Sequence, residues 1–249
     1  MKRMRIVGLC LVAVFALSAV VAASASAHAA FFECKAQAGG KYEKKCTKLQ
    51  SGKGKGGYEV VEGAGNSKTK GLFKGKGGKA TLHTPAVGGE ITCTAFSDSG
   101  YTNTATTEDK VLSVFSGCST AGKKCTSVQA KEKAGDITTF DLAGKLVDLS
   151  GGAVGVDLTP ESGTELASFT CEGLVIHVTG SVYGELTPLE KFSKKNSTVF
   201  EVTGGGVQKY TEAEGVKDVL ETELNGAGPF ESGQEATAAN SGEELEIKA

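Results

Sequence analysis

Cysteine supplies the side chains of this chain that are best suited to chemistry. The sequence contains seven cysteines, and six of them follow residue 30: Cys34, Cys46, Cys93, Cys118, Cys125 and Cys171. Thiolates bind zinc when short spacings bring several cysteines or histidines together. The C-x6-C spacing of Cys118 and Cys125, with no paired histidine, does not fit such a site. We expect disulfides and no metal site, because an even number of cysteines in an exported chain is typical of bridges.

Six cysteines allow 15 pairings, and the sequence alone does not distinguish them. Short spacing favours two local pairs and leaves a long-range third: Cys34–Cys46, Cys118–Cys125 and Cys93–Cys171. The long-range bridge is expected to contribute most to stability, because the entropy of loop closure grows with loop length. It would tie two sheets together, as the inter-sheet disulfide of immunoglobulin domains does, although the chain contains no Trp and so lacks the Cys–Trp–Cys pattern of that family.

Two glycine-rich segments come close to nucleotide-binding motifs. Residues 52–57 match G-x-G-x-x-G, but no strand pattern precedes them and no helical pattern follows. Residues 117–124 approach a P-loop, yet the segment ends in Lys124 where serine or threonine is required. Residues 117–121 also approach the nucleophile elbow G-x-S-x-G, which needs a strand–turn–helix setting in an α/β sheet. Neither cofactor binding nor a serine nucleophile is predicted here.

Histidines and carboxylates are the other candidates for hydrolytic chemistry. His83 and His177 each lie in a strand-like run, where a half-exposed histidine on a sheet face is the expected outcome. Glycosidases instead place two carboxylates on either side of the scissile bond. Candidates for such a pair, on or beside strand-like runs, are Glu90, Asp98, Glu108, Asp136, Asp141 and Glu185. Any β protein of this size supplies a similar set, so no catalytic residue is assigned.

Residues 1–29 carry the features of a secretory signal peptide. Lys2, Arg3 and Arg5 precede an uncharged apolar run over residues 6–22. Three overlapping A-x-A patterns then predict cleavage near residues 27–29. The alternative is an uncleaved membrane anchor. Once the signal is removed, no apolar run long enough to span a membrane is left in the sequence.

Charge is distributed unevenly along the rest of the chain. Residues 31–80 contain 12 lysines and 4 carboxylates, whereas residues 211–249 contain 10 carboxylates and 2 lysines. The Lys/Gly patches at residues 52–57 and 74–79 are typical of a flexible, solvated segment, since glycine loses much entropy on ordering. We therefore predict a loop-like N-terminal segment over residues 30–71. A basic arm of this kind could bind an anionic polymer, but it lacks the interleaved aromatic residues that nucleic-acid binding needs.

Residues 72–249 are predicted to form one all-β domain with an acidic C-terminal part. Short runs rich in Val, Ile, Thr and Phe alternate at period two, and Gly, Ser, Asn and Asp separate them. This pattern indicates an antiparallel β-sandwich or barrel with disulfides. Residues 212–224 are the best helical candidate but fit a strand equally well. Ser241–Gly242 has the composition of a closing hairpin turn.

Several short motifs resemble a family of secreted proteins from high-GC Gram-positive bacteria. The motifs are ITCT at Cys93, FSGC at Cys118, DITTFDLAGKL from Asp136, FTCEG at Cys171 and VTGSVYGELTP from Val178. The resemblance covers roughly residue 72 to the C-terminus. It implies an exported, disulfide-containing, β-rich bacterial protein and brings no catalytic residues with it.

The sequence as a whole favours a secreted or cell-envelope-associated protein that is not an enzyme and has a binding or structural role. The sequence does not identify the ligand: a cell-wall or other extracellular polymer is one candidate partner, and neither nucleic acid nor a cofactor is expected. The alternative is a secreted hydrolase that acts on a polysaccharide or another polymer through a carboxylate pair. A concave pocket that holds two carboxylates would favour the hydrolase.

Overall fold

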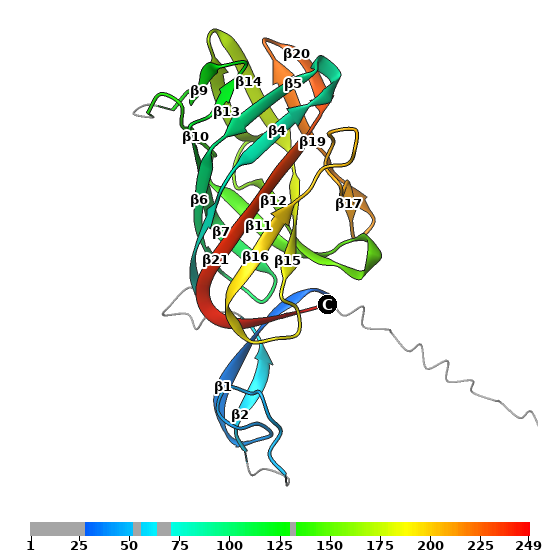
Figure 1. The fold of residues 1–249 in the computed structure, drawn as a ribbon. Helices are drawn as coiled ribbons and strands as arrows, with labels where there is room; N and C mark the ends of the chain where they lie inside the picture. Colours follow the sequence, from blue (N-terminus) through cyan, green and yellow to red (C-terminus); the bar gives the residue numbers. More distant parts are fainter. Residues whose placement is uncertain (1–27, 52–55, 64–70, 130–132) are drawn as a thin grey trace, which may run out of the picture.

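The computed structural model describes residues 28–51, 56–63, 71–129 and 133–249 (Figure 1). Residues 1–27 of the expected signal peptide and residues 52–55 of the first Lys/Gly patch lie outside this range. The regular secondary structure of the described part is almost entirely strand, as the sequence predicts for an all-β protein. None of its helices is long and apolar enough to cross a membrane.

The elements, in chain order, are β1 (Ala30–Gly40), β2 (Gly56–Glu62), β3 (Gly71–Gly77), β4 (Ala80–Thr84), η1 (Pro85–Val87), β5 (Gly89–Cys93), β6 (Ala95–Thr102), β7 (Thr107–Ser116), β8 (Ser119–Thr120), β9 (Lys123–Ser127), β10 (Ile137–Thr138), β11 (Leu142–Asp148), η2 (Ser150–Gly152), β12 (Val154–Pro160), β13 (Glu165–Cys171), β14 (Leu174–Gly180), β15 (Val182–Thr187), β16 (Ser193–Phe200), β17 (Glu212–Ala213), β18 (Val216–Lys217), β19 (Leu220–Leu224), β20 (Ala227–Glu231) and β21 (Gly233–Lys248).

Eight strands close into an antiparallel barrel, which decides between the two architectures that the sequence leaves open. The hydrogen-bonded neighbours run β3–β6–β7–β11–β12–β15–β16–β21 and return to β3. Closure removes the free edges that an open sheet would present to other chains. Side chains at alternate positions fill the interior, among them Leu142, Leu146 and Val156.

Strand β3 closes the barrel with glycines on its inner face. Gly75 pairs with Asp98 and Gly77 with Phe96 on β6. A Cβ atom at Gly75 would lie 1.7 Å from Asp98 Oδ1, and one at Gly77 would lie 1.9 Å from Phe96 Cε1. The second Lys/Gly patch is therefore not a flexible segment at residues 74–77. Its glycines make room for larger side chains of the neighbouring strand, while its lysines face solvent.

Eight further strands, β4, β5, β8, β9, β13, β14, β19 and β20, extend the barrel at one end, the upper end in Figure 1. β4 and β5 continue from β3 and into β6, and β14 continues into β15. Their pairings run β21–β4–β5–β8–β9–β13–β14–β19–β20. Apolar side chains of these outer strands belong to the same core as those of the barrel, including Ile91, Phe169 and Leu220. The outer strands thus form a roof over the barrel.

The N-terminal segment contains two strands, so the expectation of a loop over residues 30–71 is wrong for β1 and β2. The two strands pair with each other, and the Cys34–Cys46 bridge closes the loop that follows β1. Figure 1 shows this hairpin projecting from the lower end of the barrel. The first residues of β1 also pair with the end of β21, and Phe31 packs into the main core. Pairing and burial of this kind are not visible in a Lys/Gly-rich composition.

The C-terminal region differs from the sequence expectation in two places. Residues 212–224 contain strands β17, β18 and β19, so the helical reading is wrong. Ser241–Gly242 is not a hairpin turn, because β21 runs through it as one strand of 16 residues. The register against β16 shifts between Ser193 and Lys195, opposite this point. Gly242 therefore lies where the strand bends around the barrel. A Ser–Gly pair at such a bend has the same composition as a hairpin turn.

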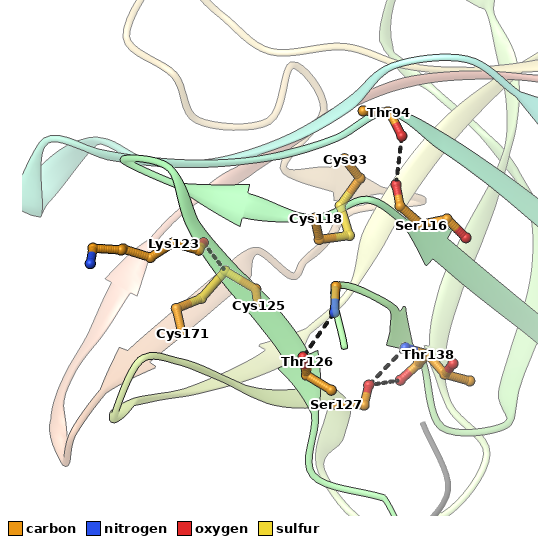
Figure 2. Close-up of a disulfide and its surroundings, with 11 residues drawn as sticks. Cys93, Thr94, Ser116, Cys118, Lys123, Cys125, Thr126, Ser127, Thr138 and Cys171 are labelled. Atoms are coloured by element: carbon orange, nitrogen blue, oxygen red, sulfur yellow. Dashed lines mark hydrogen bonds between the residues drawn. A yellow bond between two sulfur atoms is a disulfide. The ribbon is translucent and has the colours of Figure 1, made fainter. Parts of the chain in front are cut away.

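Four cysteines lie close together on neighbouring strands: Cys93 ends β5, Cys118 directly precedes β8, Cys125 is in β9 and Cys171 ends β13 (Figure 2). The structure contains the expected Cys34–Cys46 bridge, but the other two expected pairings are wrong. The observed bridges are Cys93–Cys118 and Cys125–Cys171. Cys118 and Cys125 face each other in a β-hairpin, where the Cys125 N–H donates to the Cys118 carbonyl at 3.0 Å. Hydrogen-bonded pairs hold their side chains farther apart than non-hydrogen-bonded pairs, so each cysteine bonds outward to the next strand.

Mass spectrometry of a non-reduced tryptic digest will test this pairing. Trypsin cleaves after Lys123 and Lys124, which separates Cys118 from Cys125. We expect peptides that join Cys93 to Cys118 and Cys125 to Cys171. A peptide that joins Cys118 to Cys125 would contradict the strand register.

Gly77→Ala will test the close packing inside the barrel. The added methyl group meets the Phe96 ring, which itself stacks on Phe115 with the ring centroids 5.4 Å apart. We expect the free energy of unfolding to fall by about 1–3 kcal/mol, as is usual for overpacked cores. Gly78→Ala is the matched control, since nothing lies within 4 Å of the position of its added Cβ. Equal stability of the two variants in urea titrations would show that β3 can move outward.

Candidate functional site

An apolar chamber of about 110 Å³ lies where the barrel meets its roof. The outer strands contribute Ile91, Leu166 and Leu220 to its wall. The barrel contributes aromatic and aliphatic side chains, including Phe96 and Phe115. The chamber therefore exists only because two groups of strands that are far apart in sequence enclose it.

A smaller cavity of about 50 Å³, here called the vestibule, lies nearer the lower end of the barrel and has both polar and apolar side chains in its lining. Four residues line both spaces: Asp98, Val111, Leu158 and Phe200. The exposed Lys191 and Glu243 stand at the rim of the vestibule. The interior thus has a mixed lining towards the opening and a mostly apolar lining towards the roof.

A β-bulge in β7 turns Glu108 towards the vestibule. On β6, Ser99 is opposite Leu112, but Tyr101 is opposite Asp109, so β7 has one extra residue between these pairs. The same shift appears against β11. Lys110 lies in the bulge with a positive φ of 52°. Because the extra residue changes which side chains face inward, Glu108 and Val111 both line the interior although three positions separate them.

Two of the carboxyl groups that line the vestibule, Asp98 and Glu108, have a raised pKa. Burial, and secondarily the neighbouring Asp98, raise the pKa of Glu108 to about 7. Burial also raises the pKa of Asp98. Neither group takes part in a salt bridge within the described residues. The structure therefore brings together two of the six carboxylates that the sequence offered for a pair.

Several oxygen atoms in the vestibule lack a hydrogen-bond donor. Asn240 is only 8% exposed, and its Nδ2 donates to Thr198 Oγ1 at 2.8 Å. This leaves Asn240 Oδ1 without a partner, and the same holds for Asp98 Oδ1 and Asn196 Oδ1. All three residues line the vestibule. Buried acceptors without donors are rare, because each one loses its hydrogen bonds to water.

The histidines do not form a catalytic triad. Ser168 Oγ and Glu165 Oε1 both contact His177 through Nδ1, at 3.2 Å and 2.9 Å. A triad needs the serine and the carboxylate on opposite ring nitrogens. The two contacts of His83 are carboxylates, Glu90 at 3.3 Å and Glu235 at 3.2 Å. Both histidines are therefore placed as structural side chains on strand faces.

The other sequence candidates are scattered. Asp141 forms an ion pair with Lys110 at 3.0 Å, and Glu185 accepts a hydrogen bond from Tyr210 Oη at 2.7 Å. Glu90 lies beside His83, and Asp136 is placed just before β10. Residues 117–124, which approach a P-loop, form the β8–β9 hairpin, with no helix after it.

One group of potential metal ligands occurs among the described residues, formed by His28, Asp148 and Glu214. Lys145 Nζ already lies 2.6 Å from Glu214 Oε2 and supplies a positive charge there. His28 is largely exposed. The group is an ion-pair cluster on the surface and carries no metal assignment.

Comparisons with protein-family models, with curated proteins and with solved structures returned no match for this chain. The site therefore stands on its own geometry. Sequence reasoning named Asp98 and Glu108 but missed Asn240, Asn196 and the apolar chamber. Alternation of large side chains and glycines along residues 71–77 and 96–102 is the one signal that indicates a filled barrel interior there.

Glu108→Gln will test the electrostatics of the vestibule. The unfolded carboxyl ionises near pH 4.5 and the folded one near pH 7, so folding favours the protonated form. The contribution of Glu108 to the free energy of unfolding is therefore fully present below pH 4.5 and is lost as the pH rises towards 7. We expect the amide to stabilise the protein at pH 8, relative to pH 5, by up to about 3 kcal/mol. Urea unfolding at both pH values measures this difference.

The control for this measurement is Glu231→Gln, which removes one exposed carboxylate from β20. Its stability should follow the pH dependence of the unchanged protein. If Glu108→Gln does the same, Glu108 is solvated like a surface carboxylate.

Proposed function

We propose that this protein is a secreted, non-enzymatic binding protein that holds one small apolar molecule inside its barrel. The apolar chamber carries the proposal. Ligand sites in proteins are concave and mostly apolar, with a few polar groups that fix orientation, and the mouths of barrels are frequent places for them. The chamber supplies the apolar lining of such a site, and the adjoining vestibule supplies the polar groups.

The size of the chamber limits the ligand. A cavity of about 150 Å³ lined by Leu, Ile and Phe stays dry and binds benzene or xenon. At about 110 Å³, with further space in the vestibule, the interior suits a molecule built on a single ring or a short alkyl chain. A stably folded barrel has no structural need for an empty chamber, since voids lower stability.

The disulfides support an extracellular location. The structure contains three bridges, and disulfides form and persist mainly in oxidising environments. Two of them link neighbouring strands of the roof. These two bridges hold the upper wall of the chamber together. Such bridges would keep the cavity intact in a protein that works outside the cell.

One observation supports the hydrolase alternative, and the size and lining of the cavity oppose it. Asp98 and Glu108 do line a common concave space, which a carboxylate pair requires. The space measures about 50 Å³, which is smaller than a cavity for one benzene ring. Its aromatic lining is phenylalanine, with no tyrosine. A polysaccharide strand needs an open cleft, so the geometry favours a small ligand over a polymer.

Thermal unfolding with small apolar probes will test the proposal. Benzene, toluene and ethylbenzene are added to the disulfide-bonded protein at increasing concentration. A ligand that binds only the folded state stabilises it by about 2.7 kcal/mol at one hundred times its Kd. We expect Tm to rise with concentration for at least one of these probes.

Two variants that fill the chamber make the result specific. Ala167→Leu and Ala236→Leu place extra methyl groups in the wall and should abolish the rise in Tm. Ala95→Leu adds the same groups at an exposed position of β6 and should leave it unchanged. No rise for any probe, or an equal rise in all variants, would contradict binding in the chamber.

A further inference from the structure

The vestibule and the apolar chamber are walled by common residues, so one ligand can contact both. Asp98, Val111, Leu158 and Phe200 line both spaces. An apolar body in the chamber therefore directs any polar group of the ligand towards Asp98. This step rests on the proposed function, because it takes the chamber to be the site of the apolar body.

The vestibule offers acceptors in excess of donors. Asp98 Oδ1 and Asn240 Oδ1 converge on one point beside Gly75, since a Cβ built there would lie 1.7 Å from the first and 2.1 Å from the second. Both oxygens lack a hydrogen-bond partner. The amide nitrogen of Asn240 donates to Thr198 Oγ1 and to neither of these oxygens. Glu108 adds a second carboxyl group to the same space.

The charges around the vestibule, like its unpaired acceptors, favour a ligand with a cationic hydrogen-bond donor. Four titratable side chains line the vestibule. Three are acids, Asp98, Glu108 and Glu243, and the fourth is the base Lys191. Lys191 is exposed at the rim, so it does not neutralise the interior. Buried carboxylates are normally paired with a cation. A ligand can supply both the missing cation and the missing donors.

We propose that the natural ligand is a small primary amine with an apolar, single-ring or short alkyl body, and that its ammonium group binds between Asp98, Glu108 and Asn240. An ammonium group has three donors and no acceptor, which matches three oxygen acceptors. Hydrogen bonds between charged partners are roughly twice as strong as neutral ones. Glycine at position 75 is part of this site, because any larger residue would occupy the place where the oxygens converge.

Three ligands of similar shape and different charge will test this proposal at pH 8. They are benzylamine, ethylbenzene and phenylacetate, and their Kd values are measured by isothermal titration calorimetry on the disulfide-bonded protein. We expect benzylamine to bind at least about tenfold more tightly than ethylbenzene, which corresponds to about 1.4 kcal/mol. Phenylacetate should bind more weakly than ethylbenzene, because its carboxylate meets two others.

Asp98→Asn and Glu108→Gln will show whether the vestibule is responsible. Each should remove most of the preference for benzylamine over ethylbenzene, measured as the ratio of their two Kd values. Glu231→Gln, which removes an equal charge from the exposed face of β20, should change neither value. Circular dichroism of each variant verifies folding, and the comparison of the three ligands on the unchanged protein needs no variant.

The outcomes separate the two proposals. If ethylbenzene binds and benzylamine binds no better, or if the preference survives both substitutions, the ammonium site is refuted and the apolar carrier remains. If phenylacetate binds best, the vestibule recognises an anion and the inference is overturned. If none of the three binds, the proposed function fails as well.

Discussion

Closure of the barrel by β3 is the constraint on which the rest of the structure depends. β3 must pair with β6 on one side and β21 on the other, and its inner face must leave room for the side chains that they bring. Glycines at positions 75 and 77 meet this requirement, because a Cβ atom at either place would collide with Asp98 or Phe96. The same choice that lets the barrel close therefore admits a carboxyl group to its interior.

The interior is divided by the way the strands end. At the upper end the barrel strands continue into the roof, whose apolar side chains enclose the chamber. At the lower end a β-bulge turns Glu108 inward beside Asp98, so this part becomes acidic. The disulfides lie at the two extremities: one closes the loop after β1, and the other two join strands of the roof. Each end thus has a covalent restraint near the opening or the cover of the cavity.

Burial raises the pKa of the two neighbouring carboxyl groups Asp98 and Glu108, so their ionised forms oppose folding. Acceptors without donors add to this cost. Residues that break the usual rules of packing and hydrogen bonding tend to occur where a protein binds or reacts. Asp98, Asn196 and Asn240 line one cavity, whereas two other buried polar groups without partners, Asp157 and Gln208, lie outside it.

The sequence by itself determined the all-β class, the cysteines that form bridges and the set of carboxylates from which the vestibule is built. Period-two alternation and the even cysteine count can be read from the sequence directly, so they indicate strands and bridges without knowledge of the fold. Tertiary structure alone decided that Cys118 bonds to Cys93 and not to its neighbour in the hairpin, because pairing depends on which strands lie side by side. It also decided that the Lys/Gly patch becomes a barrel strand and that Asp98 meets Glu108. Glycine carries no hydrophobic signal, and a bulge of one residue reverses the faces of a strand, so these features exist only once the barrel has closed.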